Sequence, residues 1–138
     1  MNHGINEWGM SVKTNMEEKI RTFMDLRAWQ QCHALVLLTY RITKTFPRDE
    51  IYGLTSQMRR AAVSITSNIA EGFGRKHFKE KHQFYSQAHG SLLELQSQLI
   101  VAKDIGYLPV RNFSDIMFQS ELAYSQLQGL LRATKDRC

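Results

Sequence analysis

The side chains with the greatest capacity for chemistry are concentrated in one stretch of the chain, residues 57–71. Polar and small residues recur there at spacings of four and three, which places them on one side of a helix. A stripe of this kind lets a neighbouring helix come close and exchange hydrogen bonds, because buried polar groups must be paired. Residues 91–94 supply hydroxyl and carboxyl partners for it. The predicted polar stripe consists of Gln57, Ser64, Asn68, Glu71, Ser91 and Glu94.

Two interpretations of this stripe remain open, because it can fix the register of two packed helices or recognise a ligand. Nucleophilic catalysis is not indicated, since no His or Lys stands at a spacing that would activate the Ser64 hydroxyl. Glu71 and Glu94 could pair across two helices, but two carboxylates alone are weak evidence of acid–base catalysis. The sequence therefore predicts a protein that is not an enzyme and that has no cofactor.

Metal binding is also disfavoured by spacing. Bundle proteins that hold two metal ions use Glu-x-x-His on two helices, and this pattern occurs nowhere in the chain. His77 and His82 are five residues apart, which does not place them on the same face of a helix. We predict no metal site.

A basic segment, GRKHFKEKH over residues 74–82, follows the polar stripe. It lies at the expected start of a helix, where unpaired N–H groups and the helix dipole attract phosphate. Phe73 or Phe84 could stack a nucleobase there. The alternative is a solvated helix end, which charge runs usually form. The predicted nucleic-acid-binding residues are Arg59, Arg60, Arg75, Lys76, Lys79 and Lys81.

Length, charge and cysteine content narrow the class of protein. A chain of 138 residues, 43% hydrophobic and 22% charged, fits one folded domain. Its net charge of +5 is compatible with an anionic partner. The only cysteines are Cys32 and Cys138, which favours a reducing compartment over a disulfide framework. No apolar run approaches the ~20 residues of a membrane span, and no signal segment is recognisable. We expect a cytoplasmic protein that does not bind a membrane.

Apolar spacings of three and four residues predict four helices that would position these side chains. The helices are expected between Asp25, as an N-cap, and Pro47, from Leu54 to Gly72, from His77 to Gly106, and after Pro109. Short connections between long helices favour an antiparallel up-and-down four-helix bundle. This bundle occupies residues 23–138, and residues 1–22, which lack periodicity, form a flexible N-terminal extension.

Glycines add two local predictions. Those in Gly72-Phe73-Gly74 suit a left-handed cap at the end of the second helix. Gly90 lies in the middle of the third helix, where glycine costs about 1 kcal/mol relative to alanine, so another backbone is expected to approach closely there.

The first and fourth predicted helices are apolar on more than one side. In the first, the expected core face is Leu26, Trp29, His33, Val36, Leu37 and Tyr40. The apolar residues left over on the other sides predict contacts between copies in a homo-oligomer, because a helix that is apolar on both sides is usually buried on both. The alternative is that these are scattered surface residues, which are common. The expected oligomer contacts are Leu35, Leu38, Ile42, Phe118 and Leu122.

The order of these residues resembles that of a known family. The matching strings are Asp25-Leu26-x-x-Trp29-Gln30, Tyr40-x-x-Thr43-x-x-Phe46-Pro47-x-x-Glu50-x-x-Gly53-Leu54-Thr55-x-Gln57, Arg59-Arg60-Ala61-Ala62, Ser64-Ile65-x-x-Asn68-Ile69-Ala70-Glu71-Gly72, Gly90-Ser91-Leu92-x-Glu94-Leu95 and Gly106-Tyr107-Leu108. Across roughly residues 24–130, the chain is similar to the four-helix-bundle family of 23S rRNA intervening-sequence proteins.

The resemblance implies a bacterial protein whose copies form a ring-like oligomer, a pentamer in this family. Relatives with the same fold accompany diversity-generating retroelements and contact a reverse transcriptase and nucleic acid. No catalytic residues are established for the family, so none is transferred to this chain. We therefore predict a non-catalytic oligomeric binding protein that binds RNA or DNA through its basic residues. The alternative is a protein–protein adaptor that docks a partner enzyme such as a reverse transcriptase.

Overall fold

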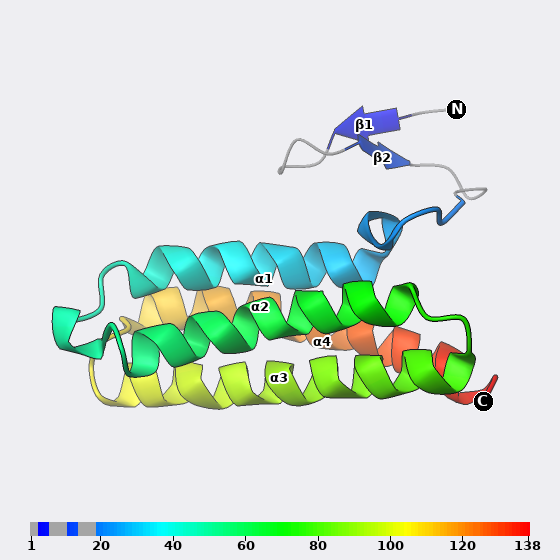
Figure 1. The fold of residues 1–138 in the computed structure, drawn as a ribbon. Coiled ribbons are helices and arrows are strands. Elements are labelled where there is room, and N and C mark those ends of the chain that lie inside the picture. Colours follow the sequence, from blue (N-terminus) through cyan, green and yellow to red (C-terminus); the bar gives the residue numbers. More distant parts are fainter. Residues whose placement is uncertain (1–2, 6–10, 14–18) are drawn as a thin grey trace.

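The computed structural model describes residues 3–5, 11–13 and 19–138, and four long helices dominate it (Figure 1). The helices are α1 (Arg27–Thr43), α2 (Leu54–Phe73), α3 (Phe78–Asp104) and α4 (Val110–Lys135). Two short 3-10 turns, η1 (Phe23–Asp25) and η2 (Arg48–Glu50), precede α1 and α2. The prediction of an all-α protein with four helices is confirmed.

Each helix packs against two others, so the four enclose one core: α1 contacts α2 and α4, and α3 contacts the same two helices. Contacts between α3 and α4 run in reverse order along the two helices, so the start of α3 lies beside the end of α4. His82 Nδ1 lies 3.0 Å from Thr134 Oγ1, whereas Gln96 Nε2 donates to Ser120 Oγ at 3.0 Å. The sequence colours in Figure 1 also run in opposite directions along consecutive helices. The α2–α3 connection and the end of α4 therefore meet at the same end of the bundle.

The start of α1 differs from the prediction. Asp25 does not cap α1, because its carboxylate accepts hydrogen bonds from the N–H groups of Arg21 and Thr22, at 2.9 and 3.1 Å. The bond from Thr22 belongs to the capping box of η1. Leu26 stands at the N-cap position of α1 and gives no side-chain cap. The Asp25 carboxylate, which was predicted to cap α1, therefore caps the preceding 3-10 turn η1.

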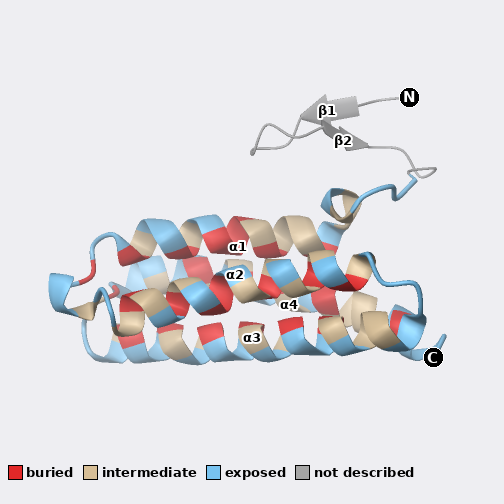
Figure 2. Ribbon diagram, in the orientation of Figure 1, coloured by how far each residue is buried: buried red, intermediate tan, exposed pale blue. Residues whose placement is uncertain are grey.

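Buried residues recur along all four helices, as the colours of Figure 2 show, and they form one core cluster. The contribution of α1 was predicted in part: Val36 is buried, and Leu26 and Trp29 pack against the core cluster, as expected. Leu37 and Tyr40, which were expected in the core, are 40% and 39% exposed, whereas Leu35, an expected oligomer contact, is completely buried. The inward face of α1 follows the spacing Ala28, Cys32, Leu35, Thr39 and Thr43.

Two threonines explain this error, because a hydropathy pattern does not count threonine as a core residue. The hydroxyl of Thr39 donates to the carbonyl of Leu35 at 2.8 Å, and that of Thr43 donates to the carbonyl of Thr39 at 2.7 Å. Each hydroxyl is thereby satisfied within its own helix, so both side chains can be buried at little cost.

The other four predicted oligomer contacts differ in exposure. Leu38 and Ile42 are half-buried against the core cluster. Phe118 and Leu122 lie on the outer side of α4 and are 62% and 40% exposed. The exposed pair is available for a contact between copies, and this contact stays a prediction.

The glycine predictions are wrong in their positions. At Gly90, no other element of the described part of the chain comes within 4 Å of where a side chain would begin, so no close approach is found there. The close approach occurs at Gly72, where a Cβ atom would lie 2.8 Å from Tyr85 Cε1 and 2.9 Å from Phe84 Cβ. Gly74 ends α2 with an ordinary right-handed φ of −77°, and the left-handed glycine is Gly106, with φ +90°.

The N-terminal segment contains a feature that the sequence analysis did not predict. Strands β1 (His3–Ile5) and β2 (Ser11–Lys13) pair in antiparallel fashion, with His3 opposite Lys13. A flexible extension was predicted over residues 1–22. Apart from the two strands, residues 1–2, 6–10 and 14–18 lie outside the described part of the chain, and residues 19–22 lead into η1.

Candidate functional site

Three members of the predicted polar stripe form a hydrogen-bonded group between α2 and α3. The hydroxyls of Ser64 and Ser91 are 2.9 Å apart. Asn68 Nδ2 donates to the Ser64 carbonyl at 2.8 Å and approaches the Ser64 hydroxyl at 3.1 Å. This group joins the two helices that pack most extensively, so these three residues contribute to helix pairing.

The other three members, Gln57, Glu71 and Glu94, are exposed. Within residues 19–138, no hydrogen bond or ion pair engages their side chains. Gln57 and Glu94 line a surface cleft, together with the hydrogen-bonded pair of serines. The stripe therefore has two parts: one joins helices, and the other presents polar groups to solvent.

This cleft, which we call the polar cleft, has a volume of about 790 Å³. It lies over the first two thirds of α2, between residues of α1 and α3. Hydroxyl, amide and guanidinium groups dominate its wall. The lining residues are Tyr40, Ile51, Thr55, Ser56, Gln57, Arg59, Arg60, Ala61, Val63, Ser64, Ser67, Ser91 and Glu94.

The two arginines of the polar cleft have different environments. Arg59 is half-buried, its Nε donates to Thr43 Oγ1 at 2.9 Å, and its guanidinium lies 4.8 Å from the centre of the Tyr40 ring. The Thr43 hydroxyl can accept this bond because its proton is directed to the Thr39 carbonyl. Arg60 is exposed, with no such partner in the described part of the chain. Arg59 is thus fixed against α1, whereas Arg60 is free to reach a ligand.

Glu50 holds the connection beside the polar cleft in one conformation. Its carboxylate accepts a hydrogen bond from the Leu54 N–H at 3.1 Å and another from the Tyr107 hydroxyl at 2.8 Å. The bond from Leu54, followed by that from Tyr107, lowers the pKa of Glu50. A Cβ atom at Gly53 would lie 2.6 Å from this carboxylate, so a larger residue there would displace the end of the Glu50 side chain. The α1–α2 connection is therefore tied to both the start of α2 and the α3–α4 connection.

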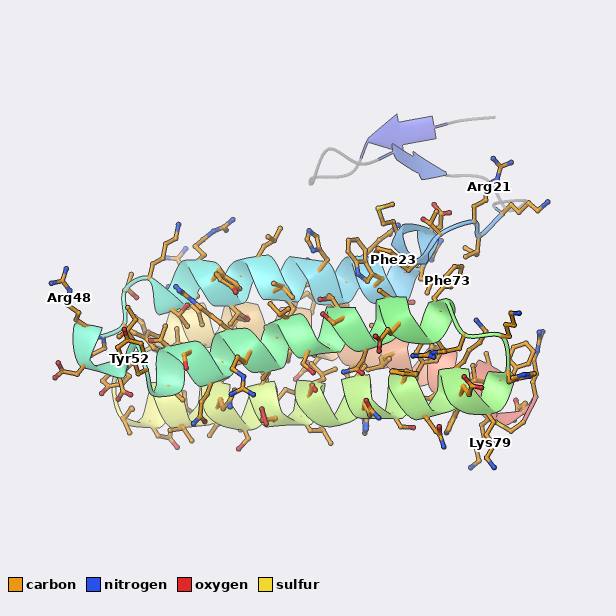
Figure 3. The ribbon with its side chains drawn as sticks, in the orientation of Figure 1. Arg21, Phe23, Arg48, Tyr52, Phe73 and Lys79 are labelled. Atoms are coloured by element: carbon orange, nitrogen blue, oxygen red, sulfur yellow. The ribbon has the colours of Figure 1, made fainter. Side chains whose placement is uncertain are left out.

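This connection also carries Tyr52, which is 93% exposed and is the most exposed aromatic residue in the described part of the chain. Figure 3 places Tyr52 and Arg48 at one end of the bundle, and Phe73 and Lys79 at the other. A smaller cleft of about 230 Å³, which shares Ile51, Thr55 and Arg59 with the polar cleft, lies at the end with Arg48.

At the opposite end, Lys81 has a structural role. Its Nζ donates to the Phe73 carbonyl at 2.6 Å and lies 5.3 Å from the centre of the Phe73 ring. The last carbonyls of α2 are thereby satisfied by a cation, as helix C-termini favour. Partial burial lowers the pKa of Lys81. The contribution of Lys81 to ligand binding is correspondingly limited.

The remaining cations of the basic segment face solvent. The Arg75 guanidinium lies 4.6 Å from the centre of the Phe84 ring, which keeps it extended along the surface. Lys76 and Lys79 are exposed. We call the group of Arg75, Lys76, Lys79, Lys81 and Arg137 the basic end.

Sequence reasoning missed Arg137. Its guanidinium lies 5.1 Å from the centre of the Phe78 ring, in the first turn of α3. The chain fold explains this contact, because the end of α4 returns to the start of α3, where His82 meets Thr134. The charged C-terminal string KDRC was the available signal, but only a correct helix order places it beside residues 74–82.

The six cations predicted as one nucleic-acid site thus fall into two groups. Arg59 and Arg60 lie in the polar cleft, and Arg75, Lys76, Lys79 and Lys81 lie beyond the end of α2. With a helix rise of about 1.5 Å per residue, Arg59 and Arg75 are separated by roughly 24 Å. One bound phosphate group cannot contact both groups, so each must be considered as a separate site.

Other reactive groups show no assembly for catalysis in the described ranges. The Cys32 thiol is buried in the core, and burial raises its pKa to about 12, which keeps it protonated. Among residues 3–5, 11–13 and 19–138, no three His, Cys, Asp or Glu side chains are grouped closely enough to hold a metal ion. None of the helices in those ranges is both long and apolar enough to cross a bilayer.

These features define a small all-α protein of four helices, with a polar cleft on one face and a basic end. The sequence model of the family described as "23S rRNA-intervening sequence protein" matches residues 24–129, and the chain belongs to this family. The match covers α1, α2, α3 and most of α4, so it includes the polar cleft and most of the basic end, but not Arg137. No curated protein matches the chain.

Proposed function

We propose that this chain is a non-catalytic oligomeric binding protein of the cytoplasm and that its basic end binds the phosphates of RNA or DNA. The observation that supports this is the meeting of cations from three segments of the chain. The α2–α3 connection, the first turn of α3 and the C-terminal residues after α4 contribute Arg75, Lys76, Lys79 and Arg137.

The local geometry suits a phosphate backbone. Arg75 and Arg137 are each held against an aromatic ring, and such stacked guanidiniums keep their donors available for bidentate contacts with phosphate. The N-cap residue His77 gives no side-chain hydrogen bond to the first turn of α3, so N–H groups there can also meet an anion. Phe78, 36% exposed, offers a ring at the same place for a base to stack on.

We further propose that copies associate in a ring-like homo-oligomer, with five members by analogy with the family. The exposed side chains of Phe118 and Leu122 on α4 support an association through this face. A ring repeats the basic end in each copy, and this repetition raises the effective affinity for one strand without any new contact.

A salt titration of nucleic-acid binding tests the first proposal. Fluorescence anisotropy with a labelled single-stranded RNA, and in parallel a DNA duplex, gives the slope of log affinity against log salt. For single strands each phosphate contact contributes about −0.7 to this slope. We expect the variant Lys76→Ala/Lys79→Ala to bind more weakly and to have a slope shallower by about 1.4.

The matched control is Arg41→Ala/Arg111→Ala, which removes the same charge from exposed positions at the opposite end of the bundle. If both double variants lose the same affinity, only net charge matters and the basic end is not the site. Binding that does not depend on salt would also exclude the proposal.

A second candidate function is that of a protein–protein adaptor for a partner enzyme such as a reverse transcriptase. The observation that favours it is the same exposed pair, Phe118 and Leu122, since an apolar patch with a polar rim is typical of protein interfaces. Light scattering of Phe118→Ser/Leu122→Ser separates the two roles. A loss of the oligomer assigns the patch to contacts between copies. An intact oligomer leaves the patch available for a different protein.

A further inference from the structure

The polar cleft contains a guanidinium that the chain already holds in place. Arg59 is fixed by Thr43 and by the Tyr40 ring, so it loses little additional conformational entropy when it binds a ligand. Its hydrogen bond to Thr43 uses only Nε, which leaves the four N–H donors of the two terminal nitrogens. A guanidinium with this restraint is suited to bidentate recognition of a phosphate.

Arg60 brings a second positive charge to the same wall of the cleft. Both arginines line the cleft, as does Ser56, which lies one helical turn before Arg60. In the residues that the structure describes, no carboxylate is within ion-pair distance of either arginine. Neither guanidinium is engaged in an ion pair with a described residue, so both remain available to an anion.

The wall that faces α3 has a different chemistry. Glu94 and Ser91 come from α3, and Gln57 of α2 lines the same cleft. Their carboxylate, hydroxyl and amide groups can pair with sugar hydroxyls or with the exocyclic amine of a base. The carboxylate of Glu94 also repels a second phosphate, so the cleft suits a ligand with one phosphate better than a polyanion.

The remaining surface and the size of the cleft indicate what accompanies the phosphate. Tyr40, Ile51 and Val63 each line the cleft and expose 39–53% of their surface, which gives an apolar area for a planar ring. A volume of about 790 Å³ lies in the range of about 300–1,000 Å³ that is typical of small-molecule sites.

We propose that the polar cleft binds a nucleoside monophosphate. The phosphate lies between Arg59 and Arg60, the base rests on the apolar surface that includes Tyr40, and Gln57 and Glu94 pair with sugar or base. The same group is offered by a free mononucleotide and by the phosphorylated terminal nucleotide of a strand. This site does not depend on nucleic-acid binding at the basic end, which is roughly 24 Å away.

Isothermal titration calorimetry of the full chain with adenosine monophosphate and uridine monophosphate tests the proposal. We expect saturable binding at micromolar to millimolar concentrations, and we expect Arg60→Ala to weaken it about tenfold, because a charge-assisted contact to phosphate is lost. Arg60 is exposed, so this variant is expected to fold normally. Arg59→Lys, which keeps the charge but not the bidentate fork, is the second variant and should also weaken binding.

Two controls locate the ligand. Adenosine, which lacks the phosphate, should bind much more weakly, and inorganic phosphate should not reproduce the affinity of the nucleotide. Lys76→Ala/Lys79→Ala at the basic end should bind the mononucleotides as the unchanged protein does. If that double variant loses mononucleotide binding while Arg60→Ala retains it, the nucleotide belongs to the basic end and the proposal is wrong.

Competition identifies the source of the nucleotide. A short oligonucleotide with a terminal phosphate that displaces the mononucleotide, while its unphosphorylated form does not, points to a strand end. Displacement by neither oligonucleotide points to a free mononucleotide. The absence of saturable mononucleotide binding, equal binding of inorganic phosphate, or unchanged affinity in Arg60→Ala would overturn the proposal. The proposal for the basic end would stand in each of these cases, because it is measured by the salt dependence of RNA binding.

Discussion

The polar cleft and the basic end each contain one cation that the chain uses internally and another that it leaves exposed. In the cleft, Arg59 is bonded to Thr43, whereas Arg60 faces solvent. At the basic end, Lys81 is bonded to the Phe73 carbonyl, whereas Lys79 is exposed. Positions that carry the same charge therefore differ in how far the chain restrains them: Arg59 and Lys81 also hold a partner within the chain, whereas Arg60 and Lys79 do not.

The two regions differ in how firmly the rest of the chain positions them. The cleft lies beside a connection that Glu50 ties to Leu54 and Tyr107. The basic end instead depends on close packing between the last turn of α2 and the first turns of α3 around Gly72. A fixed wall with mixed chemistry suits recognition of a small molecule, and a convergence of exposed cations suits attraction of a backbone of phosphates.

The largest expected effect is at the packing that positions the basic end. Gly72→Val would place side-chain atoms where Tyr85 and the Phe84 Cβ already lie, and overpacking of this kind costs about 1–3 kcal/mol. The control is Gly90→Ala, where nothing lies nearby and where alanine should stabilise the helix by about 1 kcal/mol. Urea denaturation at a fixed protein concentration measures both. Equal effects of the two substitutions would show that Gly72 does not mark a close approach.

A smaller effect should separate the two arginines of the cleft. Arg59→Ala removes the hydrogen bond to Thr43 and the contact with the Tyr40 ring, and it should cost about 1–2 kcal/mol of unfolding free energy. Arg60→Ala should change stability by less than about 0.5 kcal/mol, as expected for an exposed side chain. Thermal or urea unfolding compares the variants directly. A greater loss in Arg60→Ala would reverse the roles assigned to the two residues.

At the basic end, Lys81 and Lys79 should differ in the same way as Arg59 and Arg60, with a smaller difference in unfolding free energy. Lys81→Met removes a cation from the last carbonyls of α2 and should cost about 0.5–1 kcal/mol, while RNA affinity falls little. Lys79→Met should leave stability nearly unchanged and should weaken RNA binding instead. Unfolding curves and anisotropy titrations of the same two preparations give the comparison. Equal losses of RNA affinity would mean that Lys81 also contacts the ligand.

The sequence predicted the four helices well because their apolar spacing is regular over long segments. It failed where burial depends on residues that hydropathy does not weight. Thr39 and Thr43 fill the inward face of α1 because their hydroxyls bond within the helix, and Leu35 is buried one turn before Thr39. For this reason, the predicted core face of α1 was placed too far round the helix, toward Leu37 and Tyr40.

The candidate site was predicted less completely than the fold. The serine pair between α2 and α3 follows from spacing alone, because residues of a stripe face the adjacent helix. The division of the cations into restrained and exposed members does not follow from spacing. It depends on partners that are distant in sequence, such as the Thr43 hydroxyl and the Tyr40 ring for Arg59. The position of Arg137 at the basic end depends on the path of the whole chain.

The smallest expected effect concerns the rigidity of the connection beside the cleft, and it depends on pH. Two hydrogen bonds lower the pKa of Glu50 in the folded protein, so its carboxylate contributes stability at pH values above its ordinary pKa. This contribution is lost as the pH falls through the lowered value, because the protonated group accepts the bonds from Leu54 and Tyr107 less well. The Glu50→Gln variant should therefore melt below the unchanged protein at neutral pH, and the difference should shrink in acid.

Asp49→Asn, an exposed neighbour in η2, should show a smaller difference. Melting temperatures measured between neutral pH and pH values below the ordinary pKa of a glutamate provide the comparison. A difference between Glu50→Gln and the unchanged protein that stays constant over this range would mean that the charge of Glu50 does not hold the connection, and the contrast in rigidity between the two regions would no longer rest on it.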